Sequence, residues 1–312
     1  MYSFVIPCYN SSESIRHVVE LTMEEMEKMN RREFEFVLVN DYSSSTKTMP
    51  VLKKLAEEYP CVTVLNLAKN AGQHNAIMAG LNYAKGDILI GMDDDMQTHP
   101  SQLPYLFEEL EKGYDIVYGY YPEKKHSAFR NFGSWVNYIS VRILIGKPKE
   151  LKTSSYWVAR KFVRDSVIEY QAPYAYIQGL FLRTTRNISC IPIQHFQREE
   201  GESNYTFKRL LKLWSNIIGF SITPLRLTEY CGFGVSLLSI IAAVVVLIRK
   251  ILNPAMALGW PSLMIVICFF SGIQLMFLGL IGEYIGRMFL GLNRQPQYVI
   301  REVIRQESEE QE

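Results

Sequence analysis

Three consecutive carboxylates, Asp93, Asp94 and Asp95, form the pattern in this sequence that most clearly predicts chemistry. They follow directly after the apolar run 88–92, and Gln97 comes two residues later. Crowding like charges at the end of a buried strand is costly, so we expect a nearby cation to compensate them. Carboxylate and amide oxygens suit Mg²⁺ or Mn²⁺, and Mg²⁺ commonly shares its coordination sphere with substrate phosphates. A solvated acidic loop that caps the next helix is the alternative explanation.

Polar residues also follow three other segments that we expect to be strands. They are Pro7, Tyr9 and Asn10 after the first, Asp41 after the second, and Asn70 and Gln73 after the third. The carboxyl ends of parallel strands meet at one edge of a sheet, which is where open α/β sheets bind ligands. Asp41 is suited to bind a base N–H or ribose hydroxyls, and Tyr9 can stack on a base. Asn and Asp after a strand are ordinary turn formers, so the prediction rests on their convergence at one edge.

The elements that must position these residues alternate between strand and helix patterns. We expect strands at 2–7, 34–40, 62–67, 87–92 and 116–119, and helices at 12–29, 48–59, 75–84 and 104–112. Such alternation predicts an α/β fold, a Rossmann-like and mostly parallel sheet flanked by crossover helices. No G-x-G-x-x-G follows the first strand and no G-x-x-x-x-G-K-[ST] occurs, which disfavours dinucleotide and P-loop chemistry.

Composition excludes several other classes of function. The 33 Lys and Arg residues nearly balance the 32 Asp and Glu residues, so no global field attracts nucleic acid. Five scattered cysteines fit a reducing compartment, without a disulfide framework or a zinc site. The apolar run before Cys8 is too short for a signal peptide, so we expect the N-terminus to lie in the cytosol.

Two apolar segments interrupt the soluble pattern. Residues 232–248 contain no charge, and 261–282 are similarly apolar, so both reach the length that spans a bilayer. We expect two transmembrane helices, at about 229–250 and 261–285, that form a hairpin. Basic residues flank the hairpin on both sides and place both termini in the cytoplasm, although Arg249 and Lys250 in the short connection weaken that orientation. A buried helix hairpin of a soluble protein is the alternative.

The remaining organisation follows from these spans. Residues 1–204 are expected to form the catalytic domain, 205–226 an interfacial amphipathic region, 227–289 the membrane hairpin and 290–312 a cytoplasmic tail. Residues 205–220 place apolar side chains on one helical face with basic residues at its edge, which is typical of a helix lying in a membrane interface. Residues 135–145 are a second candidate, and packing of either segment on the sheet is the alternative. The end of the tail, 302–312, is expected to be disordered.

Five motifs together resemble glycosyltransferase family 2. They are V-I-P-x-Y-N at 5–10, V-N-D-Y-S at 39–43, N-x-G-Q-H-x-A-x-x-A-G at 70–80, M-D-D-D-M-Q at 92–97 and R-x-x-G-x-S-x-Y at 198–205. The last motif and G-L-I-G-E-Y-I-G-R at 279–287 are similar to the polyprenyl-phosphate group of this family, which includes dolichyl-phosphate mannose synthases and bacterial undecaprenyl-phosphate glucosyl and aminoarabinose-type transferases.

The resemblance implies a GT-A fold and inverting, metal-dependent transfer from a UDP- or GDP-sugar to a polyprenyl (undecaprenyl) phosphate. It implies an integral protein of the bacterial inner membrane with its catalytic domain in the cytoplasm, and a tetramer as a candidate oligomer. The implied catalytic residues are Asp93, Asp95 and Arg198, and the implied ligands of Mg²⁺ or Mn²⁺ are Asp95 and Gln97. The implied nucleotide-binding residues are Pro7, Tyr9, Asn10, Asp41, Asn70, Gln73 and Asp93. The implied contacts of the diphosphate or acceptor phosphate are Arg198, Ser203, Lys208 and Arg209.

One segment departs from the family pattern. Related sequences commonly have an acidic residue where this chain has 151–157, which contains no carboxylate. A hydroxyl acceptor would need a general base, whereas a lipid phosphate arrives as an anion. The departure therefore favours a phosphate acceptor, with Asp94 as a candidate helper. A processive polysaccharide synthase and a non-catalytic membrane protein that binds sugar nucleotides or lipid are the alternatives.

Overall fold

The structure is a computed structural model that describes residues 1–122, 142, 146–194, 223–252 and 259–306. Its centre is an eight-stranded sheet in the order β7-β5-β6-β4-β1-β2-β3-β8. The strands are β1 (Tyr2–Cys8), β2 (Phe34–Asn40), β3 (Val62–Leu67), β4 (Ile88–Gly91), β5 (Ile116–Tyr120), β6 (Trp157–Arg160), β7 (Ile188–Pro192) and β8 (Ile300–Ile304). β1 pairs in parallel with β2 and β4, and β2 with β3, which confirms the predicted parallel α/β half.

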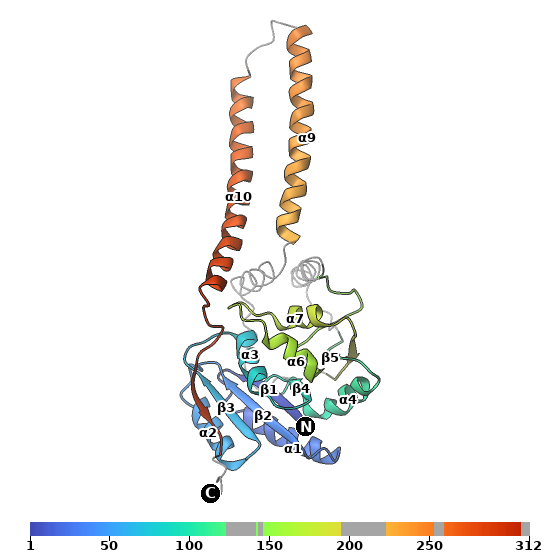
Figure 1. Cartoon of the computed structure of the whole chain (residues 1–312), viewed down its shortest axis with the longest axis vertical. Helices are drawn as coiled ribbons and strands as arrows, with labels where there is room; N and C mark the ends of the chain where they lie inside the picture. Colours follow the sequence, from blue (N-terminus) through green and yellow to red (C-terminus); the bar gives the residue numbers. More distant parts are fainter. Residues whose placement is uncertain (123–141, 143–145, 195–222, 253–258, 307–312) are drawn as a thin grey trace.

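Helices cover both faces of this sheet (Figure 1). They are α1 (Ile15–Lys28), α2 (Thr48–Glu58), α3 (Gln73–Tyr83), α4 (Leu103–Glu111), α6 (Lys161–Ile168) and α7 (Ile177–Thr184), with a short 3₁₀ turn at Pro100–Gln102 before α4. The residues of β1 alternate between two buried cores, because successive side chains of a strand point to opposite faces. Phe4 and Ile6 pack with apolar residues of α1, α2 and α4, whereas Val5 packs with those of α3, α6 and α7.

The half of the sheet beyond β4 contains the antiparallel pairs that the sequence patterns did not reveal. β6 lies between β4 and β5 and is antiparallel to both, and β7 then pairs in parallel with β5. Gly91 at the end of β4 is opposite Trp157 of β6. A Cβ atom at Gly91 would lie 2.2 Å from the Trp157 ring, so a glycine is needed where the indole lies across the strand.

The expectation of disorder for the tail is wrong at its start. Residues 302–304 belong to β8, which pairs antiparallel with β3 at the edge of the sheet. Ala68 N donates to Val299 O over 2.7 Å, and Lys53 forms an ion pair with Glu302 at 3.2 Å. Local composition could not reveal this strand, since its stabilisation comes from an edge formed by residues more than 200 positions earlier.

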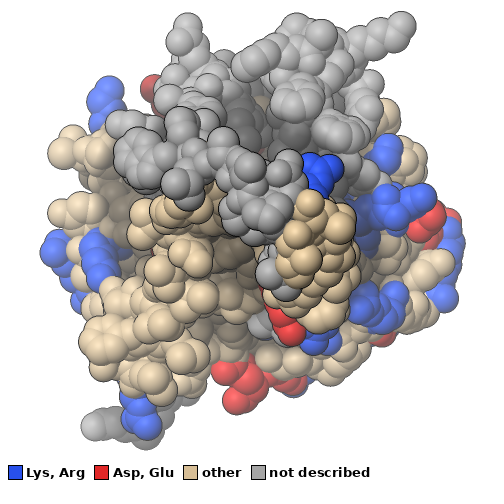
Figure 2. Space-filling view, turned by 90° about the horizontal axis from the view of Figure 1, so that it is seen from above, with Lys and Arg blue, Asp and Glu red and all other residues tan. Residues whose placement is uncertain are grey.

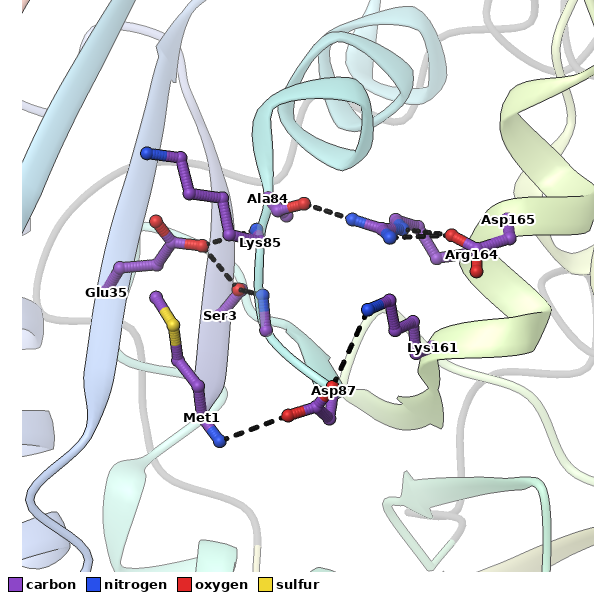
Figure 3. Close-up of polar contacts among 10 residues, drawn as sticks. Met1, Ser3, Glu35, Ala84, Lys85, Asp87, Lys161, Arg164 and Asp165 are labelled. Atoms are coloured by element: carbon purple, nitrogen blue, oxygen red, sulfur yellow. Dashed lines mark hydrogen bonds and ion pairs between the residues drawn. The ribbon is translucent and has the colours of Figure 1, made fainter.

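Polar contacts close the amino-terminal edge of the strands, opposite the predicted site (Figure 3). Glu35 accepts hydrogen bonds from Ser3 Oγ and Lys85 N, both over 2.6 Å. Asp87 forms ion pairs with the N-terminal amine at 3.4 Å and with Lys161 at 3.8 Å. The hydrogen bonds of Glu35 hold the loop that leads into β4 against β1, whereas the ion pairs of Asp87 are largely exposed.

Two long helices, α9 (Thr223–Leu252) and α10 (Trp260–Leu292), extend away from the sheet and run side by side (Figure 1). Many of the apolar side chains described on them are exposed, including Phe233 of α9 at 75% and Leu292 of α10 at 77%. Such a large exposed apolar surface is unsuited to water. Within the described residues, one stretch meets the length and composition of a membrane span, Phe269–Leu292 of α10. The expected interfacial segments at 205–220 and 135–145 lie almost wholly outside the described residues.

Candidate functional site

The acidic turn at 93–98 follows β4, and its backbone is held by hydrogen bonds within the turn. Asp93 N donates to Thr98 Oγ over 2.9 Å, and Gln97 N donates to Asp95 Oδ1 over 3.2 Å. Met96 has a φ of 61°, a left-handed conformation uncommon for a residue with a side chain, and it is buried. The turn therefore directs the three carboxylates to different neighbours instead of leaving them as a disordered acidic loop.

Asp93 is held by two side chains that come from distant segments. Gln73 Nε2 donates to its Oδ1 over 2.9 Å, and Ser155 Oγ donates to its Oδ2. The pKa of Asp93 is raised to about 7, chiefly by burial and also by the charges of Asp95 and Asp94, while the hydrogen bonds from Ser155 and Gln73 act in the opposite direction. Ser155 is a site residue that the sequence motifs missed, although it lies in the segment 151–157 that departs from the family pattern. The segment places a hydroxyl, in place of a carboxylate, beside the acidic turn.

Asp94 connects the acidic turn to the end of β1. Its Oδ2 accepts a hydrogen bond from Tyr9 N over 3.0 Å, and its backbone carbonyl accepts one from Ser14 Oγ. Burial raises the pKa of Asp94. The contacts of this side chain are those of a residue that fixes the loop carrying Tyr9 against the turn.

Asp41 binds the loop that precedes α3. Its two carboxylate oxygens accept hydrogen bonds from Ala71 N over 2.6 Å, Gly72 N over 2.9 Å and Asn70 Nδ2 over 3.0 Å, and the residue is 4% exposed. Gly72 has a φ of 86° with open space around it, so this position needs glycine for its backbone conformation. Sequence reasoning assigned Asp41 to the nucleotide, and that role stays a prediction; the structure gives the carboxylate a structural task as well.

Tyr9 and Asn10 lie at the same edge, after β1. The side chain of Asn10 joins this loop to the loop after β2, since its Nδ2 donates to Ser44 Oγ over 3.0 Å and its Oδ1 accepts from Ser45 N over 2.9 Å. Tyr9 is 51% exposed and available to a ligand. The predicted site residues that the structure describes thus lie at one edge of the sheet. Pro7 is next to the end of β1, where it pairs with Val39 of β2. Arg198, Ser203, Lys208 and Arg209 lie outside the described residues.

The residues suited to hold a divalent cation are Asp95 and Gln97. Within the parts of the chain that the structure describes, no group of three or more His, Cys, Asp or Glu side chains is assembled as a metal site. Mg²⁺ does not need such a group, because one or two carboxylates suffice when substrate phosphates and water supply the other ligands. The hard oxygens of Asp95 and Gln97 in a half-buried turn fit this requirement.

His74 follows Gln73 in the first turn of α3. Its ring lies edge-on to Tyr176 with centroids 5.1 Å apart, and its Nδ1 is buried without a hydrogen-bond partner in the described structure. Burial lowers the pKa of His74 to about 4 from its usual 6.5. The imidazole is therefore neutral in the folded protein near neutral pH.

We expect this histidine to make the protein less stable on acidification. Between pH 6.5 and about 4 the unfolded chain binds a proton at His74 that the folded protein does not, so stability falls as pH falls through this window. His74→Phe, which keeps an aromatic ring against Tyr176, should flatten the dependence of the unfolding temperature on pH. His17→Gln, at an exposed position of α1, is the control. An equally steep profile for His74→Phe and the parent would contradict the prediction.

The sheet, its acidic turn and the polar loops along one edge define a glycosyltransferase of the GT-A kind. The sequence profile of glycosyl transferase family 2 matches residues 3–170, and the chain belongs to this family. It is 34% identical, over an alignment of 321 positions, to an undecaprenyl-phosphate 4-deoxy-4-formamido-L-arabinose transferase of Edwardsiella ictaluri. The alignment covers 99% of this chain and 97% of that protein. A protein of the same name from Pseudomonas savastanoi pv. phaseolicola is 33% identical, with coverage of 98% and 92%.

Solved structures show the same fold. Glucosyl-3-phosphoglycerate synthase from Mycobacterium tuberculosis, in complex with Mn²⁺ and UDP-glucose, matches with a TM-score of 0.50 and 16% identity over 71% of this chain and 79% of that chain. The same enzyme in complex with phosphoglyceric acid matches with a TM-score of 0.50 and 15% identity over 71% and 80%. These matches, at low identity, confirm the expected GT-A fold.

Proposed function

We propose that this glycosyltransferase moves one sugar from a UDP-sugar onto undecaprenyl phosphate, with inversion, at the cytoplasmic face of a bacterial inner membrane. The observation that carries the proposal is the joining of an acidic GT-A edge to the exposed apolar helix α10 in one chain. The names of the two relatives support a lipid phosphate as the acceptor, and both relatives are similar to this chain over nearly its full length. The complex of the Mycobacterium tuberculosis enzyme with UDP-glucose makes UDP the first nucleotide to test.

The chemistry of the site agrees with a phosphate acceptor. A phosphate oxygen attacks the anomeric carbon, the bond from that carbon to the nucleoside diphosphate breaks, and the diphosphate leaves with the electron pair. The acceptor is already an anion, so no proton has to be removed from it. Ser155 places a hydroxyl beside Asp93, in a segment, 151–157, that contains no carboxylate, and this fits a reaction without a general base.

The residues of the chain then act by positioning and by balancing charge. Asp93, fixed by Gln73 and Ser155, would face the sugar nucleotide, and Arg198 would neutralise negative charge on the diphosphate or the lipid phosphate. Asp95 and Gln97 would hold Mg²⁺ or Mn²⁺, which supplies Lewis-acid stabilisation to the leaving group when bound.

Membrane attachment follows from the two long helices. We place both α9 and α10 across the bilayer, which returns the chain to the catalytic domain at β8 and puts both termini in the cytoplasm. Seen from above, Lys and Arg side chains are spread around the outline of the molecule, with Asp and Glu side chains among them (Figure 2). Charges of both signs are mixed there, so the proposed attachment rests on the apolar helices. Residues 205–226 would lie in the interface, and a tetramer is the assembly that the family resemblance suggests.

A donor screen tests the proposal. The full-length protein in lipid nanodiscs is incubated with undecaprenyl phosphate, Mn²⁺ and a panel of UDP- and GDP-sugars that includes UDP-4-deoxy-4-formamido-L-arabinose, and the released nucleoside diphosphate is measured. We expect release with one class of donor, dependent on both lipid and metal, and a lipid product with a single sugar. A hydroxyl acceptor that replaces the lipid phosphate, or a polymeric product, would contradict the proposal.

A further inference from the structure

A cleft of about 480 Å³ lies beside the acidic turn, and three segments far apart in the sequence form its walls. The first wall is the start of α3, with Gln73, His74 and Asn75, and the second is the loop 173–175. The third is 295–297, the segment through which the chain returns from α10 to the sheet. Gln73 both lines the cleft and donates a hydrogen bond to Asp93, so the cleft adjoins the candidate site.

Gln297 holds the second wall in place. Its Nε2 donates to Tyr170 O over 2.6 Å and to Ala172 O over 2.8 Å, at the start of the loop that continues to 175. Two donations from one amide nitrogen fix the backbone of this loop at two points. The return segment 295–297 therefore determines where the second wall of the cleft, the loop 173–175, lies.

Asn75 then connects this loop to α3. Its Nδ2 donates to Pro173 O over 3.0 Å, and its Oδ1 accepts from Ala175 N over 3.4 Å. A continuous series of contacts thus runs from Gln297, through the loop and Asn75, to the first turn of α3. Gln73, which contacts Asp93, lies in that same turn.

The return segment is anchored on both sides. Before it, the Arg287 guanidinium of α10 lies over the Tyr174 ring at 4.7 Å and pairs with Glu283 at 2.8 Å. After it, β8 pairs with β3 at the edge of the sheet. The end of the long apolar helix contacts the cleft through Arg287, and the residues that follow the helix continue along the cleft to the sheet.

The lining of the cleft indicates the chemistry of its ligand. Amide side chains of Asn70, Gln73, Asn75, Gln295 and Gln297 line it together with His74, Lys69 and Tyr174, and no carboxylate is among its lining residues in the described part of the chain. Amides offer both donors and acceptors and so match hydroxyl and acylamido groups, which belong to the sugar. Lys69 suits the diphosphate to which the sugar is joined, and the Tyr174 ring is already in contact with the Arg287 guanidinium.

We infer that this cleft holds the sugar of the donor and that Gln297 is a positioning residue for it, acting through the loop 170–175. The inference rests on the proposed function, since it names the part of the donor that the site selects. It assigns to the segment after the membrane helix a role in choosing the substrate, in addition to attachment.

The test compares Gln297→Met with the parent, as full-length proteins in lipid nanodiscs. Met keeps the length of the side chain and removes both hydrogen bonds. The loss of these two hydrogen bonds should raise the KM for UDP-4-deoxy-4-formamido-L-arabinose about tenfold. The Kd of UDP alone and the KM of undecaprenyl phosphate should each change less than about twofold. Gln297→Lys, whose ammonium can donate to both carbonyls, should restore part of the lost affinity.

Two further variants separate positioning from folding. Gln295→Ala removes a side chain that lines the cleft and leaves the Gln297 contacts with the loop in place, and it should raise the same KM about threefold. Glu302→Gln removes the exposed ion pair of β8 with Lys53, on the same returning chain but away from the cleft, and should leave every constant unchanged. Unfolding temperatures of all variants are measured alongside.

The outcomes distinguish the inference from the proposed function. Three results for Gln297→Met would overturn the inference: binding of UDP and of the UDP-sugar weakened equally, binding of both unchanged, or a rise confined to the KM of the lipid phosphate. In each case, turnover by the parent protein would still uphold the proposed function. If the parent releases UDP from no donor in the presence of lipid phosphate and Mn²⁺, the proposed function fails and the inference fails with it.

Discussion

Replacing Asp95 by alanine in the full-length protein is expected to lower the rate of sugar transfer by about 10²–10³-fold. Asp95 lies in a half-buried turn, and we propose that it holds, with Gln97, the cation that stabilises the leaving diphosphate. The loss should appear mainly in kcat, because charge on the leaving group develops as the bond breaks. Released nucleoside diphosphate, measured over a range of Mn²⁺ concentrations, is the readout.

Asp87→Asn is the matched control for this variant. Asp87 lies just before β4, at the opposite end of the strand from the acidic turn, and its ion pairs with the N-terminal amine and Lys161 are largely exposed (Figure 3). Exposed ion pairs contribute little to stability, so activity and unfolding temperature should stay close to those of the parent. Retention of at least a third of the parent rate by Asp95→Ala would rule out Asp95 as an essential metal ligand.

Asp41→Ala should destabilise the fold by about 3 kcal/mol, because the buried carboxylate is lost and three partly buried hydrogen-bond donors lose it as their acceptor. Those donors are the N–H groups of Ala71 and Gly72 and the side-chain amide of Asn70. They position the start of α3, so the hydrogen bond from Gln73 to Asp93 should be lost as well. We therefore expect a lower unfolding temperature together with a large loss of activity.

The control for Asp41 is Asp165→Asn, which removes an exposed carboxylate paired with Arg164. Asp41→Asn should fall between the parent and Asp41→Ala, since one oxygen remains as an acceptor while the new amide group faces N–H donors. A variant Asp41→Ala with the unfolding temperature of the parent and reduced affinity for UDP would show that Asp41 serves the nucleotide and contributes little to the loop.

The first half of the fold could be predicted from sequence patterns, because each of its strands and helices has a clear period of apolar residues. Alternating strand and helix periods in 1–120 predict crossover units, and each crossover brings the next strand parallel to the last. The ends of β1 to β4 then had to meet at one edge. The acidic turn, Tyr9, Asn10, Asp41, Asn70 and Gln73 were predicted there for that reason, and the described structure places them there.

The contacts that each of these residues makes depend on the three-dimensional packing of distant segments. Asp41 supports the loop before α3, Asp94 supports the loop of Tyr9, and Ser155 reaches Asp93 from a segment that the sequence marked only by its lack of a carboxylate. A hydrogen bond forms only when the donor–acceptor distance is right to within a few tenths of an ångström and the direction is suitable. Residue type and spacing in the sequence do not specify either.

The end of the chain shows the same division. Its composition is charged and short of apolar residues, which by itself predicts disorder, yet Ile300–Ile304 is a strand because β3 offers it an unpaired edge. Periodicity and motifs were enough to predict the family, the polar edge and the apolar helices. The cleft beside Asp93 and its wall after α10 depend on tertiary packing, because they join three segments, 69–75, 173–175 and 295–297, that are far apart in the sequence and become neighbours only when the sheet is complete.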